Sequence, residues 1–570
     1  MKQVSEILSR LQKRSDIGVT LFDKSIHQNK YVSYKTLHED ALYFAEHLKK
    51  LNVKKDEPVV IMLPNNYDFL VAFWGCIYFG AIPTAIYPPM KLGALDLWEQ
   101  RTRSLCNSLS AQYIVSQDPI YCLGHKGVSH LKLIEIKNIK RDTSLGAPVE
   151  RGPNDIAFIQ FSSGTTGNPR PIIITQKNVL INSKDILDSF TLTKKEKHAC
   201  ASWLPLYHDM GLVGAMICSL RKKGNFYLLR PEVFLANPLL WFEVIHKYRV
   251  NFTLAPNFAF DLCQRRIKKE QLLNFDLSCL EVILSGAENV SYQTVNNFIE
   301  WFGEAKLNPL SIMPVYGMAE ATLGVSFSPH LKGPQFSYFN KNELISNQKA
   351  VVDKSGIPLA ALGSPIGKMK LKIKNDKGED QKEGVLGEVC IRGESISPGL
   401  YHPRHNIGHF NYGDFMRTGD QGFRHKGELY LWGRIKDLII INGKNIDAHY
   451  IESQLNDLSF IRKGQVMAFG ILDDNAIEKL IILCELAKNT SYEHNFTKQV
   501  EGIIFKSIGI KPYKIEFYSS GSLPKTSSGK LQRSKAKELW LKSDIKDYKE
   551  ANRFNLLAKV LKGKWKSVLG

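Results

Sequence analysis

Short apolar runs of strand length alternate with amphipathic stretches of helix length through roughly the first 300 residues. Three of these runs are residues 58–63, 156–161 and 280–285. Strands separated by helical lengths favour α/β layers in which most strands lie parallel. From about residue 360 the runs are short, alternate in polarity and lie between glycine turns, as at 369–373 and 387–391. This second pattern predicts a smaller, β-rich subdomain.

The chain has 570 residues, which is too long for one ordinary hydrophobic core, so two or more domains are expected. A hairpin-like stretch at 426–432 is followed by Gly433-Arg434-Ile435-Lys436-Asp437, which we interpret as a joint. We therefore predict an α/β fold class, with a large N-terminal domain of layered sheets and helices plus the β-rich subdomain over residues 1–432. A small α+β C-terminal domain would occupy residues 433–570.

The chain is basic, with 76 lysines and arginines against 56 aspartates and glutamates and a formal net charge of +20. Such an excess suits nucleic acid, an anionic membrane, a phosphate-rich ligand or an acidic protein. The lysines are spread along the chain and zinc-finger or helix-turn-helix signals are absent, so nucleic acid is not expected as a partner. A generally basic surface without a single function explains much of the charge as well.

Nine cysteines at irregular spacing, without a CxxC pair, are typical of reduced and mostly buried thiols. Together with an N-terminus that lacks a signal-peptide core, they predict a cytoplasmic protein. Residues 69–89 carry no charge, but Gly80, Pro83, Pro88 and Pro89 would break a membrane-spanning helix. We expect a buried helix over about 68–79, then a buried strand over 81–87, and no stable membrane insertion.

Three short segments, far apart in the chain, carry the chemistry: Ser162-Ser163-Gly164-Thr165-Thr166-Gly167-Asn168-Pro169-Arg170, Tyr316-Gly317-Met318-Ala319-Glu320 and Leu523-Pro524-Lys525-Thr526-Ser527-Ser528-Gly529-Lys530. The first follows a predicted strand, and its small residues, hydroxyls and amide N–H groups suit phosphate oxygens. It lacks the Gly-Lys-Ser/Thr ending of a Walker A loop. The third is a loop of small residues that ends on Lys530 and could extend toward a partner domain.

In this order and at these separations the segments resemble the adenylate-forming superfamily of acyl-CoA synthetases, luciferases and peptide-synthetase adenylation domains. The resemblance implies activation of a carboxylate by ATP, which forms an acyl-adenylate and pyrophosphate. The chain departs from the family in the phosphate loop, where Pro169-Arg170-Pro171 replaces the usual Pro-Lys-Gly, so the mobility of that loop is expected to differ. Many relatives also carry threonine at the position of Ala319.

The same resemblance implies how ATP and Mg²⁺ would be bound. Tyr316 would stack on the adenine, beside a wall formed by Ser285-Gly286-Ala287-Glu288, and Asp420 with Arg434 would contact the ribose. Glu320 and Thr165 would hold the metal. The residues expected to bind the nucleotide are Ser162, Ser163, Gly164, Thr165, Thr166, Gly167, Ser285, Gly286, Ala287, Glu288, Tyr316, Gly317, Met318, Ala319, Asp420 and Arg434.

The catalytic residues that the resemblance implies are Lys530, His208 and Glu320, with His208 near the carboxyl end of the adenylate. Lys436 matches the hinge of the family. The C-terminal domain is therefore expected to be mobile and to rotate there between two half-reactions.

The resemblance is closest to the fatty acyl-AMP ligases. It rests on residues 203–212, 316–323, 433–445 and an extra segment at about 328–359. Tyr207-His208-Asp209 lies where amino-acid-activating members usually carry a Phe-Asp segment, so an amino acid is less expected than a fatty acid. Apolar segments at 214–218 and 252–260 would line the alkyl chain of a medium or long fatty acid.

In the fatty acyl-AMP ligases the extra segment is thought to disfavour coenzyme A as the acceptor. The acyl group passes instead to the phosphopantetheine thiol of an acyl carrier protein or a polyketide synthase carrier domain. Carrier domains are generally acidic, so the basic chain would attract such a partner.

Two other functions stay open from the sequence. A fatty acyl-CoA ligase would share the first step, and the 328–359 segment would then be an ordinary surface excursion. A catalytically inactive, basic binding or scaffold protein is a remote alternative, since Lys530 and Glu320 are both present.

Overall fold

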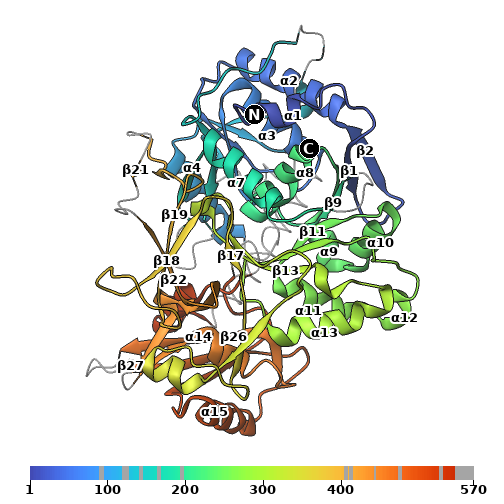
Figure 1. The fold of residues 1–570 in the computed structure, drawn as a ribbon. Helices are drawn as coiled ribbons and strands as arrows, with labels where there is room; N and C mark the ends of the chain where they lie inside the picture. The colour runs from blue at the N-terminus through green and yellow to red at the C-terminus, as the bar shows by residue number, and fades with distance from the viewer. Residues whose placement is uncertain are drawn as a thin grey trace, which may run out of the picture.

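The computed structural model describes residues 1–88, 95–117, 128–139, 141, 145–162, 169–192, 198–403, 408–409, 415–441, 444–472, 478–525 and 530–545. Figure 1 shows two large sheets with their helices, drawn in blue to green, above a smaller part drawn in orange to red. Strands β18 and β22, in yellow, lie between these parts (Figure 1). The predicted α/β fold class is confirmed by this layering.

The larger of the two sheets has nine described strands, and the run from β13 to β1 is parallel. In spatial order the strands are β17 (Ser364–Pro365), β14 (Gly324–Phe327), β13 (Ile312–Gly317), β12 (Val282–Ser285), β11 (Phe252–Ala255), β9 (Ala199–Ser202), β10 (Asn225–Leu229), β1 (Gly18–Phe22) and β2 (Asn29–Ser33). Antiparallel strands close both ends of this run. The carboxyl ends of β9, β11, β12 and β13 therefore meet at one edge, where parallel sheets bind ligands.

The second sheet has eight described strands and is parallel from β7 to β6. Its order is β21 (Gly408–His409), β20 (Gly399–Leu400), β8 (Pro171–Thr175), β7 (Ile156–Phe161), β4 (Ile82–Ala85), β3 (Pro58–Ile61), β5 (Tyr113–Val115) and β6 (Lys132–Ile134). The helices with these two sheets include α2 (Tyr34–Lys50), α3 (Tyr67–Phe79), α4 (Leu95–Leu109), α7 (Gln176–Asp188), α8 (Cys218–Arg221), α10 (Leu239–Tyr248), α11 (Asn257–Arg266) and α13 (Tyr292–Phe302).

The uncharged stretch at 69–89 folds largely as predicted, with helix α3 (Tyr67–Phe79) followed by strand β4. The side chain of Asn66 accepts a hydrogen bond from the N–H of Phe69 at 3.0 Å and so caps the helix. Gly80, with a φ of 87°, ends it in the left-handed region that favours glycine. Among the described residues, no helix has the length and apolar character that a membrane span needs.

The predicted β-rich subdomain is a four-stranded antiparallel sheet, with β18 (Lys370–Lys374), β19 (Gly387–Arg392), β22 (Met416–His425) and β23 (Glu428–Arg434) in this order. Strand β23 continues through Gly433 to Arg434, which pairs with Asp420 of β22. A short 3₁₀ helix, Ile435–Asp437, then leads out of the sheet. The domain division at residue 433 stays a prediction, and the last strand of this sheet reaches one residue beyond Gly433.

The elements after this helix form a smaller α+β part. A β24–β25 hairpin (Leu438–Ile441 and Lys444–Asp447) precedes a sheet of β26 (Ile461–Leu472), β27 (Glu478–Leu486) and β28 (Lys514–Tyr518). Three helices accompany them: α14 (Ala448–Ser453), α15 (His494–Ile508) and α16 (Arg533–Leu541).

The extra segment at 328–359 packs against this smaller part. It contains β15 (Phe336–Phe339), a short π-helix (Glu343–Asn347) and the start of β16 (Ile357–Ala360). Phe339 and Leu344 share one buried cluster with Tyr430 of the β-rich sheet and with Ile446 and Ile482 of the smaller part. The segment is therefore packed into a hydrophobic core.

Candidate active site

The first predicted segment begins where β7 ends. The N–H of Ser162 donates to the carbonyl oxygen of Arg170 at 3.1 Å, and the N–H of Arg170 donates to Ser162 Oγ at 3.3 Å. These two bonds join the ends of the loop between β7 and β8. Outside the described residues lie five of the predicted phosphate-binding positions: Ser163, Gly164, Thr165, Thr166 and Gly167.

Glu320 lies in a short 3₁₀ helix, Ala319–Ala321, just after β13. Its buried carboxylate accepts a hydrogen bond from Arg170 Nη2 at 2.8 Å, so the cation of the phosphate loop faces the predicted metal ligand. Gly317 permits this turn, because a Cβ atom there would stand 2.1 Å from the carbonyl oxygen of Leu323. The N–H of Met318 donates to that same oxygen at 2.8 Å.

Asp420 is held between two other predicted residues. Its Oδ2 accepts a hydrogen bond from the Tyr316 hydroxyl at 2.5 Å, and Arg434 Nε lies 2.9 Å from its Oδ1. Burial and the Asp420 carboxylate raise the pKa of Tyr316, so the phenol keeps its proton. The structure thus joins the predicted adenine residue and both predicted ribose residues in one cluster.

The predicted adenine wall follows β12 directly. Gly286 packs against the neighbouring strand, since a Cβ atom there would stand 2.9 Å from the carbonyl oxygen of Val315. Ala287 has a φ of 67°, and Glu288 turns back to accept a hydrogen bond from the N–H of Phe258 at the start of α11. Burial raises the pKa of Glu288.

Lys530 reaches this wall from the other end of the chain. Its Nζ donates to the carbonyl oxygen of Ala287. Burial lowers the pKa of Lys530, and the carboxylates of Glu288 and Asp209 oppose that change because they attract its positive charge. The predicted lysine therefore lies at the carboxyl edge of the nine-stranded sheet.

His208 faces the same region from the turn after β9, just before the buried π-helix Met210–Ile217. Burial and the positive charge of Lys530 lower the pKa of His208 to about 4, so the imidazole is neutral at neutral pH. Three buried polar atoms in this region, His208 Nε2, Tyr207 Oη and Ser285 Oγ, have no hydrogen-bond partner in the described part of the chain. Buried polar groups are rarely left unpaired, so these atoms fit a polar ligand.

Lys436 follows Arg434 by two residues. It is exposed in the 3₁₀ helix between the β-rich sheet and the smaller C-terminal part. This position suits a hinge, whereas the other described candidates converge on the carboxyl edge of the sheet.

The protein-family comparison matches residues 12–401 to the model described as AMP-binding enzyme. The chain belongs to this family. It is an enzyme of the adenylate-forming ligase type, as its relatives and neighbouring structures agree.

Curated relatives of this AMP-binding enzyme span nearly its whole length. The medium-chain-fatty-acid–[acyl-carrier-protein] ligase JamA of Moorena producens is 30% identical over 576 residues, which cover 95% of this chain and 96% of JamA. FadD25 of Mycobacterium tuberculosis, which carries the name fatty-acid–CoA ligase, is 29% identical over 547 residues, with 90% and 92% covered.

Solved structures agree with these relatives. One from the fatty acyl-adenylate ligases of E. coli and L. pneumophila superposes with a TM-score of 0.87 at 29% identity, covering 95% of this chain and 98% of that one. The L. pneumophila enzyme in complex with acyl adenylate and pyrophosphate superposes with a TM-score of 0.72 at 26% identity, covering 95% and 96%. The predicted resemblance to fatty acyl-AMP ligases is thereby confirmed.

The residues of this AMP-binding enzyme also fit a magnesium ion bound together with phosphates. No group of three or more His, Cys, Asp or Glu side chains placed to hold a metal occurs within the described ranges. Mg²⁺ needs only one or two carboxylates when phosphate oxygens complete its shell. Glu320, a buried carboxylate facing the end of the phosphate loop at Arg170, meets that requirement.

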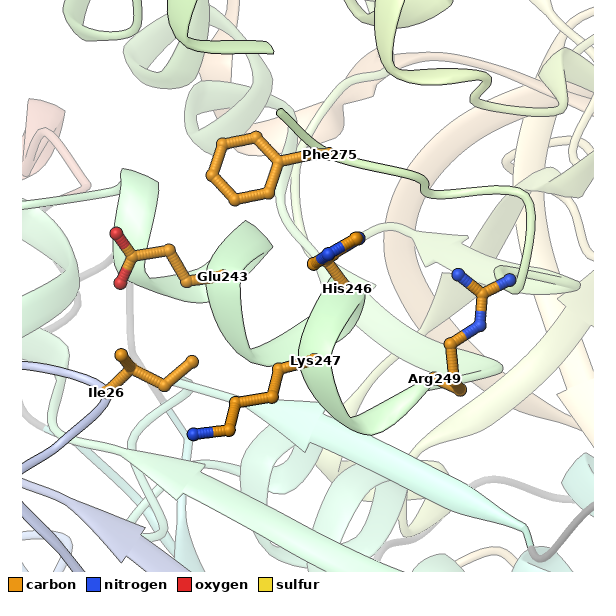
Figure 2. A pocket seen from close by; sticks show the side chains of 6 residues that line it. All are labelled: Ile26, Glu243, His246, Lys247, Arg249 and Phe275. Atoms are coloured by element: carbon orange, nitrogen blue, oxygen red, sulfur yellow. The ribbon is translucent and has the colours of Figure 1, made fainter. Parts of the chain in front are cut away.

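One depression of the described part of the chain lies elsewhere. It measures about 590 Å³ and is lined by Ile26, Glu243, His246, Lys247, Arg249 and Phe275 (Figure 2). None of the predicted site residues lines it, and two of its polar side chains already interact with Asp276. His246 Nδ1 accepts from the N–H of Asp276 at 2.9 Å, and Arg249 lies 3.4 Å from the Asp276 carboxylate.

Two residues of the site had no assigned role in the sequence. Asp209 contributes a carboxylate that acts on Lys530, and Arg170 pairs with Glu320 across 150 positions of sequence. Asp209 directly follows His208 in the sequence, so its place near the site could have been predicted. The Arg170–Glu320 contact depends on how the two sheets pack, which no local pattern reveals.

Proposed function

We propose that this enzyme activates a medium- or long-chain fatty acid with ATP and then passes the acyl group to a carrier protein. A carboxylate oxygen would attack the α-phosphorus, the bond to the bridging oxygen of the β-phosphate would break, and pyrophosphate would leave. The observation that supports the proposal most directly is the hydrogen bond from Lys530 Nζ to the carbonyl oxygen of Ala287. An ammonium placed there would stabilise negative charge on the reacting oxygens.

The roles proposed for the site residues follow the resemblance to the adenylate-forming family. Tyr316 would contact the adenine, with Asp420 and Arg434 on the ribose, and the loop from Ser162 to Gly167 around the phosphates. The close contact of Tyr316, Asp420 and Arg434 supports a single nucleoside site. Mg²⁺, held by Glu320 and by Thr165, would neutralise phosphate charge. His208, neutral at pH 7, would face the acyl carbonyl as a hydrogen-bonding group.

The fatty acid would contact the apolar segments at 214–218 and 252–260, which overlap the π-helix Met210–Ile217 and contain β11. All residues of both elements are buried, and most are apolar. Burial of an alkyl chain contributes about 0.8 kcal/mol per methylene, so a long tail needs no polar recognition. The name of JamA, a fatty-acid ligase of a carrier protein, supports this substrate class.

We infer a carrier-protein thiol as the acceptor. That thiol would attack the acyl carbonyl, the C–S bond would form, the bond to the phosphate oxygen would break, and AMP would leave while the thiol proton goes to solvent. The cluster of Phe339 and Leu344 with Ile446 and Ile482 supports this choice, because it ties the 328–359 segment to the C-terminal part. By resemblance to the fatty acyl-AMP ligases, an extra segment in this place would disfavour coenzyme A as the acceptor.

A fatty acyl-CoA ligase is the second candidate, favoured by the likeness to FadD25. The eight described cysteines are buried and form no disulfide with one another, which supports a reducing, cytoplasmic site for either reaction.

One reaction separates the two candidates. The enzyme is incubated with ATP, Mg²⁺, dodecanoic acid, coenzyme A and a phosphopantetheinylated acyl carrier protein, and products are read by mass spectrometry. Acyl-adenylate and acylated carrier without acyl-CoA are expected. Acyl-CoA as the main product would favour the second candidate, and no acyl-adenylate at all would contradict both.

A further inference from the structure

A buried arginine connects the lysine segment to the segment after the predicted hinge. Arg533 is the first residue of α16, three positions after Lys530. Its Nη1 lies 2.7 Å from Asp437 Oδ2, and Asp437 directly follows Lys436. Its Nη2 donates to Glu452 Oε1 at 2.8 Å. One guanidinium thus contacts two carboxylates from separate elements.

This arrangement leaves the guanidinium little freedom. Arg533, Asp437 and Glu452 are all buried. Glu452 Oε1 also accepts from the N–H of Ala468 at 2.9 Å, and its Oε2 lies 3.1 Å from His449 Nδ1. Buried charges are tolerated only when they are paired and hydrogen-bonded, so removal of one partner disturbs the whole group. Burial opposes the charge of Arg533, but Glu452 and Asp437 outweigh it and raise its pKa.

The group lies directly beside the base of the lysine loop. An antiparallel bridge pairs Lys525 with Leu531, and the N–H of Gln532 donates to the carbonyl oxygen of Pro524 at 2.9 Å. Arg533 is the next residue after this base. The direction in which Lys530 leaves the base therefore depends on where Arg533 is anchored.

We propose that Arg533 is a positioning residue for Lys530: through Asp437 and Glu452 it anchors the base of the lysine loop to the segment after Lys436. The Lys530 ammonium and the segment after Lys436 then move together. In naming adenylation as the affected step, this inference rests on the proposed function.

A double-mutant cycle tests the inference with Arg533→Met, Lys530→Ala and the two combined, each assayed by ATP–pyrophosphate exchange with dodecanoic acid. Arg533→Met is expected to lower kcat about 100-fold, since small misplacements of a reacting group have that effect, and to leave KM for ATP within about two-fold. The double variant should equal Lys530→Ala alone, because Arg533 acts through Lys530. Losses that multiply, or an unchanged kcat for Arg533→Met, would overturn the proposal.

Two further variants separate positioning from lost stability. Arg533→Lys keeps the positive charge but not the planar guanidinium that reaches both carboxylates, so an intermediate kcat is expected. This variant also provides a test if Arg533→Met does not fold. Arg151→Met is the matched control, because Arg151 is also buried between two carboxylates, Asp56 and Asp155. A kcat for Arg151→Met as low as that of Arg533→Met would assign the loss to stability and overturn the proposal.

Hydrogen exchange gives a readout that does not depend on activity. The N–H groups of Leu523 and Gln532, bonded to Glu485 and Pro524, should exchange faster in Arg533→Lys, while those of α15 should not change. Unchanged exchange at Leu523 and Gln532 would overturn the inference. If the wild-type enzyme forms no acyl-adenylate, the proposed function fails, and the exchange rates still decide the role of Arg533.

Discussion

At the residue scale, the most specific prediction concerns Lys530. In Lys530→Ala, the rate of acyl-adenylate formation should fall about 100- to 1,000-fold, the usual effect of removing one donor from a charged transition state. ATP affinity should change little, because Tyr316, Asp420 and Arg434 keep their mutual contacts without the amine. Pyrophosphate release and ATP titration measure the two quantities. Lys537→Ala, on the following helix, is the control and should keep the wild-type rate.

His208 makes a prediction for stability against pH. The pKa of His208 is about 4 in the folded protein and near 6.5 in an unfolded chain. Between these values the unfolded chain binds the extra proton, so the folded state loses stability as the pH falls below about 6.5, by about 2 kcal/mol at pH 5. The free energy of unfolding in urea, at pH 7 and pH 5, should fall more for wild type than for His208→Gln.

His494→Gln serves as the control for that comparison, since His494 is exposed at the start of α15. It should lose as much stability at pH 5 as wild type does. An equal loss in wild type and His208→Gln would contradict the assignment of a neutral, buried imidazole.

At the element scale, the turn from β13 to Glu320 depends on Gly317. Gly317→Ala would place a Cβ atom 2.1 Å from the carbonyl oxygen of Leu323, so the turn must shift and Glu320 with it. We expect a loss of about 1–3 kcal/mol in unfolding free energy, the usual cost of overpacking, together with a higher Mg²⁺ requirement. Thermal unfolding and Mg²⁺ titration of activity measure both. Gly303→Ala, which would meet nothing within 4 Å, should leave both near wild type.

At the scale of the whole molecule, contacts across the predicted domain division hold the closed arrangement. Lys463 of β26 lies 2.8 Å from Asp261 of α11, and Lys530 reaches Ala287. Lys463→Glu would replace attraction by repulsion, so adenylation should slow about two- to five-fold, in keeping with the strength of a partly exposed pair. Added salt should reduce the difference between variant and wild type.

The exchange of both charges is the decisive control for this contact. Lys463→Glu combined with Asp261→Lys should recover part of the lost rate, because Asp261 also pairs with Arg265 at 2.7 Å. Lys511→Glu, which reverses a charge paired with Glu501 inside the C-terminal part, should have no effect. Failure of the exchanged pair to recover activity would contradict a role of this contact in closure.

The buried helix α3 and strand β4 could be predicted because their signals are local: an uncharged run, a helix-ending glycine and the prolines that follow it. The four-stranded sheet was expected for the same kind of reason, since alternating residues and glycine turns mark its strands. Tyr316, Asp420 and Arg434 were recognisable only by resemblance. Their mutual bonds depend on the packing of β13 against the β22–β23 pair, which local periodicity does not encode.

The sequence alone determined the layered α/β class, the positions of the three motif segments and the position of Lys530 in the third, because spacing, polarity and turn residues act over short stretches of chain. Only the tertiary structure decided that Lys530 meets Ala287, that Arg170 meets Glu320 and that Arg533 joins Asp437 to Glu452. These contacts link residues that lie far apart in the chain. They arise from the packing of whole sheets and helices, whose buried surface outweighs any local preference.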